Sequence, residues 1–360
     1  MKNSKYSQGP VALPMGTEEA LRAVRDPLLK RDVVSLGYVR GLTASGSRVR
    51  FTLRLPSPAS PHGDALAAQC REALLALDDV DEVDIETAWE VPRLPALESQ
   101  TTPAALAQVK QIVAVASGKG GVGKSTVAVN LAFACARAGA RVGILDVDVY
   151  GPSVPAMLGL RDHSLAGSQQ GVLEPVVAHD LKVMSMGFLT TEETPLVWRG
   201  PIASQLVQQF LGSVAWGELD YLFVDLPPGT GDIQLTLTQA VPLSGAIIVT
   251  TPQEVAYTIA EKGLRMFQQV KVPILGIVEN MAYYHCPECG HNDPIFREGG
   301  GTAASQKLDI PLLARIPLNS SIAAAMDAGG QPRGLPTDTE VVDPEWRIYA
   351  RSAGDDKAPI

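Results

Sequence analysis

The nine residues Gly118–Thr126 read GKGGVGKST and match the phosphate-binding pattern G-x-x-x-x-G-K-[ST]. Glycines let backbone N–H groups curl around phosphate oxygens, and the helix expected to follow adds the positive end of its dipole. Lys124 would reach the β- and γ-phosphates, and the Ser125 hydroxyl would bind Mg²⁺. The segment therefore predicts a site for a nucleoside triphosphate, contacted by Gly118, Lys119, Gly120, Gly121, Val122, Gly123, Lys124, Ser125 and Thr126.

The same loop also fits the dinucleotide pattern G-x-G-x-x-G, and Asp146 follows the next apolar run as a ribose ligand would. A dinucleotide site has no use for Lys124 and Ser125, nor for a metal-binding acid on a later strand. This chain has such an acid, because Asp225 ends the apolar run of LFVDLPPGTGD. We therefore interpret the loop as that of an NTPase, with Asp225 as a magnesium ligand.

Short apolar runs alternate with helical segments after residue 108. Continuous apolar strands separated by helices predict a mostly parallel sheet covered by helices on both faces, an α/β P-loop fold. The expected strands are 111–117, 141–147, 181–186, 219–226, 245–251, 273–280 and 313–317.

A smaller α+β domain is predicted to precede this fold over residues 17–90. It contains a helix from Thr17, an apolar run over 33–43, a strictly alternating strand over 48–55, a helix over 65–77 and a strand over 80–89. Residues 1–16 are predicted to be a flexible leader and 91–107, with three prolines, a linker. The ATPase domain would span 108–330, followed by a tail over 331–360.

Cys286 and Cys289 form a C-x-x-C knuckle, with Gly290 allowing a sharp turn. Two thiolates at this spacing hold one metal ion or one edge of a cluster. Three alternatives follow: His285 or His291 completes a zinc site, the pair is a redox dithiol, or two chains each give two thiolates to one iron–sulfur cluster.

Composition excludes several classes of protein. With a net charge of −9, a large nucleic-acid-binding face is not expected, and no apolar run approaches the roughly 18 residues of a membrane span. Four cysteines in 360 residues are too few for a disulfide scaffold, and no apolar signal segment opens the chain. We expect a cytoplasmic protein with neither a nucleic-acid nor a membrane partner.

Lys119, which the basic pattern does not require, gives the loop a family resemblance. KGGVGKST resembles the MinD/ParA/Mrp ATPases, whose extra lysine contacts the nucleotide of a partner subunit. The resemblance implies an ATP-bound homodimer in which Lys119 takes part in catalysis.

The resemblance also implies roles for residues in two further motifs. In LDVDVYGPS, Asp148 would polarise the attacking water and Asp146 would support the metal shell. In DLPPGTGD, Asp225 would hold Mg²⁺ through water and the Gly229 amide would sense the γ-phosphate. Asn280 lies where related ATPases read the adenine edge.

A closer resemblance covers roughly residues 108–320. GKGGVGKST, DVDVYGPS, WRGP, VDLPPGTGD, TTPQEVA and VENMAYYHCPECG, in this order, are similar to the Mrp/ApbC family of iron–sulfur cluster carrier ATPases. RDVVSLGYVRGL resembles the SufT-like domain of bacterial members, although Ser60 stands where that domain usually has a cysteine.

The resemblance implies a Mg²⁺-dependent ATPase that binds a [4Fe–4S] cluster between two chains through Cys286 and Cys289. Apoproteins that receive the cluster would be its further partners. The competing hypothesis is a positioning ATPase of the MinD/ParA type with a structural zinc knuckle. Such proteins use an amphipathic membrane helix at the C-terminus or a basic DNA-binding face. The tail WRIYARSAGDDKAPI provides neither feature.

Overall fold

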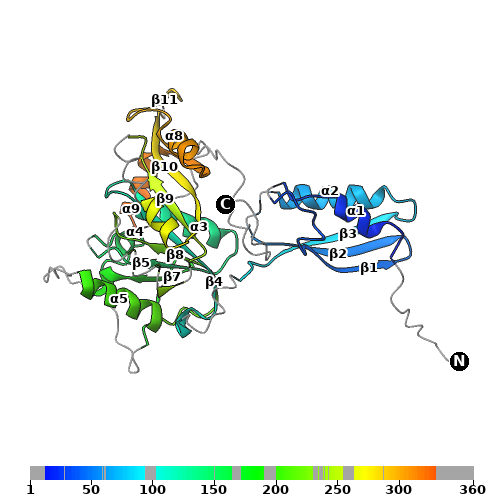
Figure 1. Ribbon diagram of the computed structural model, residues 1–360, viewed down its shortest axis with the longest axis horizontal. Helices are drawn as coiled ribbons and strands as arrows, with labels where there is room; N and C mark the ends of the chain where they lie inside the picture. The colour runs from blue at the N-terminus through cyan, green and yellow to red at the C-terminus, as the bar shows by residue number, and fades with distance from the viewer. Residues whose placement is uncertain are drawn as a thin grey trace. The chain divides into compact units, whose positions relative to one another are not determined.

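The computed structural model describes residues 13–329, except 28, 59, 61, 94–102, 150, 164–171, 190–199, 230–233, 235–237, 239, 242, 254–262 and 287. Two compact units divide at Pro92 and Arg93 (Figure 1). None of the helices in the described ranges combines the length and apolar character needed to cross a membrane. Most of the predicted leader, most of the linker and the tail lie outside the described residues.

The N-terminal unit is a three-stranded sheet in the order β1-β2-β3 with two helices. The alternating strand β2 buries Val49, Phe51, Leu53 and Leu55 against the helices. β1 and β2 are antiparallel, whereas β2 and β3 are parallel because α2 connects them. The elements are α1 (Thr17–Ala23), β1 (Val39–Ser45), β2 (Arg48–Leu55), α2 (Gly63–Leu75) and β3 (Glu82–Trp89).

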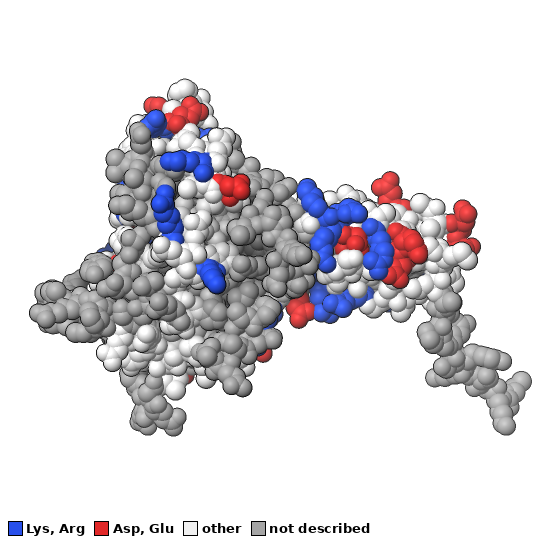
Figure 2. All heavy atoms as spheres, in the orientation of Figure 1, with Lys and Arg blue, Asp and Glu red and all other residues white. Residues whose placement is uncertain are grey.

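The other face of this small sheet carries charges of both signs. Figure 2 shows basic and acidic side chains interleaved on this unit. Register explains the pattern, because Arg48 and Arg50 on β2 lie beside Glu82 and Asp84 on β3. Arg50 and Asp84 form an ion pair of 2.6 Å.

The larger unit is built on a nine-stranded sheet in the order β11-β10-β9-β4-β8-β5-β7-β6, with β12 also paired to β10. All its pairs are parallel except those of β6 and β11, which confirms the predicted mostly parallel sheet. The strands are β4 (Val109–Ser117), β5 (Val142–Asp146), β6 (Val176–Ala178), β7 (Leu181–Ser185), β8 (Leu219–Asp225), β9 (Gly245–Thr250), β10 (Ile274–His285), β11 (Asn292–Asp293) and β12 (Leu312–Leu318).

Helices flank this sheet. α3 contacts β4, β5 and β8, while α8 contacts β10 and β12. α5 buries Val207, Phe210 and Leu211. The helical elements are η2 (Ala104–Leu106), α3 (Lys124–Arg137), α4 (Val154–Met157), η3 (Met186–Leu189), α5 (Gly200–Ser213), α8 (Gly300–Leu308) and α9 (Ser320–Asp327).

Two predicted strands differ from the structure in a way that matters. Residues 33–37 form turns, so β1 begins only at Val39. The strand expected to end at Asn280 continues to His285, because β12 and then β11 pair with its last residues. This extension carries the cysteine pair.

Candidate functional site

The phosphate loop joins the central strand β4 to the N-terminus of α3, as the motif predicts. Gly123 precedes the helix with a left-handed backbone (φ 79°). A Cβ atom there would lie 2.2 Å from Nδ2 of Asn280, so a side chain would displace Asn280 from its hydrogen bond to the loop. Only glycine meets both the conformational and the steric requirement.

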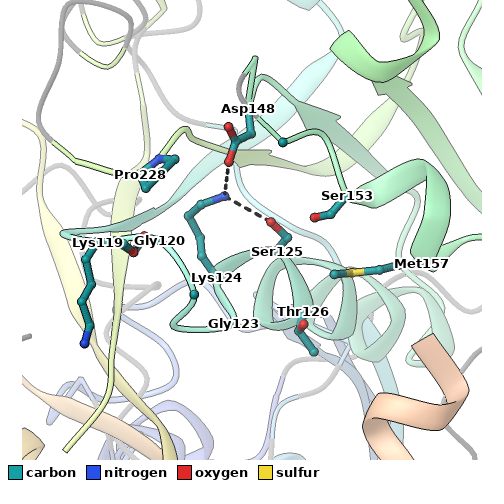
Figure 3. Close-up of a pocket in the computed structure, with 13 residues that line it drawn as sticks. Lys119, Gly120, Gly123, Lys124, Ser125, Thr126, Asp148, Ser153, Met157 and Pro228 are labelled. Carbon is teal, nitrogen blue, oxygen red and sulfur yellow. Dashed lines mark hydrogen bonds and ion pairs between the residues drawn. The ribbon is translucent and has the colours of Figure 1, made fainter. Parts of the chain in front are cut away.

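The loop encloses a cavity of about 220 Å³, shown in Figure 3. Most of the predicted nucleotide contacts line it, together with residues of both later motifs. Its lining consists of Ser117, Lys119, Gly120, Gly121, Gly123, Lys124, Ser125, Thr126, Asp148, Gly151, Ser153, Met157 and Pro228. Gly118 and Val122 belong to the same loop but do not line the cavity.

Lys124 is the charged centre of this pocket. Its Nζ lies 3.8 Å from Oδ2 of Asp148 and 3.2 Å from Oγ of Ser125 (Figure 3). The same Nζ lies 2.5 Å from Oδ1 of Asp225. Two carboxylates therefore hold a largely buried ammonium group at the start of α3. This places four predicted residues in one contact network.

Asp146 and Asp225 end neighbouring strands and are directly opposite each other in register. Asp146 accepts hydrogen bonds from the Asp148 N–H (3.0 Å), the Val154 N–H (3.3 Å) and the Ser185 hydroxyl (2.9 Å). Burial, and then the nearby charge of Asp225, raise the pKa of Asp146 to about 8. Its three donors fix the path of the chain around Asp148.

The donors present fit a magnesium ion. Oδ2 of Asp225 is buried and has no hydrogen-bond partner among the described residues. Burial raises the pKa of Asp225, and Lys124 opposes that effect. A cation coordinated by oxygen would compensate the buried carboxylate, and the Ser125 hydroxyl lies in the same contact network.

Lys119 occupies a different position from Lys124. Its side chain extends away from the Lys124, Ser125 and Asp148 cluster (Figure 3), and Nζ donates a hydrogen bond of 2.8 Å to Oε1 of Gln253. Gln253 follows β9, in the TTPQEVA motif. The Lys119 ammonium group is thus directed away from the Lys124 cluster, although Lys119 lines the cavity.

Gly229 and Asn280 both hold the backbone of the phosphate-loop region through hydrogen bonds. The Gly229 N–H donates to the Ser117 carbonyl (3.0 Å), and Nδ2 of Asn280 donates to the Val122 carbonyl (2.9 Å). Asn280 therefore supports the loop backbone. Contact of Asn280 with adenine, and of Gly229 with the γ-phosphate, stay predictions.

The cysteine pair lies at the tip of a hairpin made by β10 and β11 (Figure 1). The Cys286 N–H donates to the His291 carbonyl and the Gly290 N–H donates to the Cys286 carbonyl, both at 2.9 Å. Gly290 has φ 73°, the left-handed turn that the sequence predicts. Cys289 is exposed and Cys286 is half-buried.

The hairpin favours a thiolate at Cys286. Hydrogen bonds from the N–H groups of Cys289 and Glu288 lower the pKa of this thiol. Burial instead raises the pKa of Cys70 and of Cys135 to about 11. The two cysteines of the hairpin are therefore the metal-binding candidates, and the other two are not.

No third ligand joins this pair within the part of the chain that the structure describes. There, no three His, Cys, Asp or Glu side chains come together as a metal site would require. Nδ1 of His285 lies 2.7 Å from Oδ1 of Asn292, which holds that ring.

Sequence reasoning missed two residues that act on the predicted ones. Ser185 ends β7 directly opposite Asp146 in register and donates a hydrogen bond to it. Gln253 holds Lys119. A polar residue at the end of an apolar strand was a usable signal for Ser185, as it was for Asp146 and Asp225.

Comparisons with known proteins agree with this geometry. A family described as "NUBPL iron-transfer P-loop NTPase" matches residues 108–344, and one described as "Iron-sulfur cluster assembly protein" matches residues 17–85. The chain is 48% identical to an iron-sulfur cluster carrier protein of Synechocystis over 86% of this chain and 88% of that one. It is 38% identical to the Escherichia coli iron-sulfur cluster carrier protein over 99% and 94%.

A solved structure is similar as well. The nucleotide-binding protein of Archaeoglobus fulgidus, in complex with ADP, superposes with a TM-score of 0.56 and 42% sequence identity. The match covers 64% of this chain and 94% of that chain. The resemblances drawn from the motifs are confirmed.

Proposed function

Because this chain belongs to the NUBPL family of iron-transfer P-loop NTPases, we propose that it is a Mg²⁺-dependent ATPase that carries a [4Fe–4S] cluster between two copies of itself and delivers it to apoproteins. One observation carries the proposal. The cysteine hairpin, which has half of a cluster's ligands, extends from the same sheet edge as the phosphate loop.

The nucleotide half of this function rests on the Lys124 network. Lys124 would exchange its contact with Asp225 for the β- and γ-phosphates, and the loop N–H groups would hold the remaining phosphate oxygens. Ser125 and, through water, Asp225 would hold Mg²⁺, which would neutralise developing charge; Asp146 would support that shell. Asp148 would orient the attacking water, since its carboxylate borders the cavity.

The cluster is the cargo. A four-iron cluster takes four thiolates, and Cys286 and Cys289 supply two. Two chains related by a twofold axis would complete the set. The thiolate-stabilising N–H groups at Cys286 support this reading, because the thiolate is the form that binds iron.

The phosphate loop and the cysteine hairpin lie at one edge of the sheet, so a single dimer contact could serve both the nucleotide and the cluster. β4, β9 and β10 are parallel, so the phosphate loop and Cys286 follow strands that end on one side of the sheet. A homodimer joined through that side would let Lys119 approach the partner's nucleotide and bring the hairpins together. Reduced, unpaired thiols fit the cytoplasm, which we include in the proposal.

Anaerobic reconstitution with iron and sulfide tests the proposal. We expect about two irons and two sulfides per chain, and loss of both in Cys286→Ala and Cys289→Ala. Cys135→Ala is the matched control, since Cys135 lies on α3, where burial raises the pKa of its thiol, and should load normally. ATP hydrolysis should survive in all three variants.

One zinc per chain without labile sulfide would refute the cluster carrier. If His291→Ala then lost the zinc as well, the hairpin would be a structural zinc knuckle. That outcome would favour the positioning ATPase.

A further inference from the structure

We propose that the exposed apolar side chains of Ile295, Phe296 and Leu318, here called the apolar rim, form a contact surface for a second copy of this chain around the paired hairpins. This inference rests on the proposed function. In the proposed function the cysteines would bind the shared cluster. The apolar rim would add the protein surface that covers it.

Strand register places the rim on both sides of the cysteine strand. At Tyr284, β10 pairs with Leu318 of β12 and also with Asp293 of β11. One residue pairs with two strands only across its two edges, so Leu318 and Asp293 flank the end of β10 at roughly 5 Å each. The Ile295 N–H donates to the Asp293 carbonyl at 2.9 Å, which keeps Ile295 at the hairpin.

These side chains are unusually exposed for their type. Ile295 is 53% exposed, Phe296 39% and Leu318 38%. In the described part of the larger unit, the only other large hydrophobic residues exposed to this degree are Val172 and Val177. Exposed apolar side chains gathered beside a functional group mark a contact site more often than scattered ones do.

A second copy of the chain fits this surface better than other partners do. The adjacent thiolates need two more ligands, and an identical hairpin would provide them at the same place. A twofold contact requires a self-complementary surface, and Figure 2 shows acidic and basic side chains together at this tip.

The size of the rim agrees with a contact that depends on the cluster. Three partly exposed side chains fall far short of the roughly 800 Å² per partner of a permanent interface. The rim alone would not hold two chains together. Added to four iron–thiolate bonds, it would strengthen the dimer and exclude water from the cluster.

The test uses the full chain, reconstituted anaerobically with iron and sulfide in the presence of Mg²⁺ and ATP. The dimer dissociation constant is measured by sedimentation for wild type, for the double variant Ile295→Ser/Phe296→Ser and for Leu318→Ser. Val177→Ser is the matched control, because Val177 is 70% exposed on β6, at the opposite edge of the sheet. Unchanged ATP binding shows that each variant folds.

We expect the double variant to raise the dimer dissociation constant about tenfold or more, because a twofold interface counts each change twice. Leu318→Ser should raise it less, and Val177→Ser should leave it unchanged. Cluster loss on exposure to air should quicken in the same order.

Dimerisation of the rim variants as tight as that of wild type would overturn the inference. Normal dimerisation with slowed cluster transfer to a four-cysteine apoprotein would also overturn it, since the rim would then serve the recipient. Failure of wild type to bind iron would instead refute the proposed function, so the two failures are distinguishable.

Discussion

The nucleotide pocket and the cysteine hairpin follow parallel strands of one sheet, yet the described residues form a connected network only in the first. In the pocket, Lys124, Asp146 and Asp225 are buried and connected before any ligand binds. In the hairpin, Cys289 is exposed and the described residues offer no third ligand. The pocket is preorganised for its ligand, whereas the hairpin, in the function proposed above, would share its ligand with a second chain.

β10 connects these two regions directly. Asn280 donates to the phosphate-loop carbonyl of Val122, and Cys286 follows six residues later. Between them Met281 has φ 56°, and the pairing with β12 shifts register. A left-handed backbone at a residue other than glycine costs about 1 kcal/mol or more and persists where neighbours impose it. The position of the cysteine hairpin therefore depends on Asn280, which contacts the phosphate loop.

Lys124→Ala should have the largest effect and should separate the two regions. Removing the ammonium group deletes the phosphate anchor and leaves Asp225 uncompensated, so we expect ATP affinity to fall about 100-fold or more. Iron loading at the hairpin should persist. Lys110→Ala is the matched control, because Lys110 also pairs with a buried acid, Asp220, at 2.9 Å. Asp220 lies on β8, the strand that ends at Asp225. ATP titration measures the affinity of both variants. Near-normal ATP affinity in Lys124→Ala would contradict the assignment of the phosphate site.

Asp148→Asn tests catalysis without removing the anchor. The amide keeps the size of the side chain but no longer accepts a proton, so we expect hydrolysis to slow about 100-fold with ATP affinity largely retained. Single-turnover hydrolysis and ATP titration are measured on the same preparation. Unchanged turnover would assign water activation to another group.

Thiol labelling should distinguish Cys286, whose pKa is lowered, from Cys70 and Cys135, whose pKa burial raises. The thiolate is the reactive form, and a lowered pKa at Cys286 gives more of it near neutral pH. Cys70 and Cys135, with pKa values of about 11, should react at least tenfold more slowly at pH 8 and gain rate only as the pH rises toward 11. Mass spectrometry after alkylation measures the order in which the four cysteines react. Equal rates at all four cysteines would contradict it.

Local sequence predicted the nucleotide pocket well because most residues of the pocket are consecutive in the chain. Gly118–Thr126 supplies the loop and the helix start, and the rule that parallel strands end at one edge brings Asp146 and Asp225 together. Long-range pairing was harder to predict. Ser185 meets Asp146 only through register, and the extension of β10 past Asn280 depends on β11 and β12. No local pattern encodes those partners.

Gly290→Ala should have the smallest effect and should act on the hairpin alone. Gly290 has φ 73° and a Cβ there would meet nothing within 4 Å, so the only penalty is the left-handed backbone, about 1 kcal/mol. We expect cluster affinity to fall about fivefold with ATP hydrolysis unchanged. Gly46→Ala is the matched control: it has φ 62° and equally open space in the turn between β1 and β2, so it should cost similar stability without changing iron binding. Iron retention against a chelator measures the difference. Equal retention in the two variants would mean that the turn at Gly290 does not set the geometry of the thiolates.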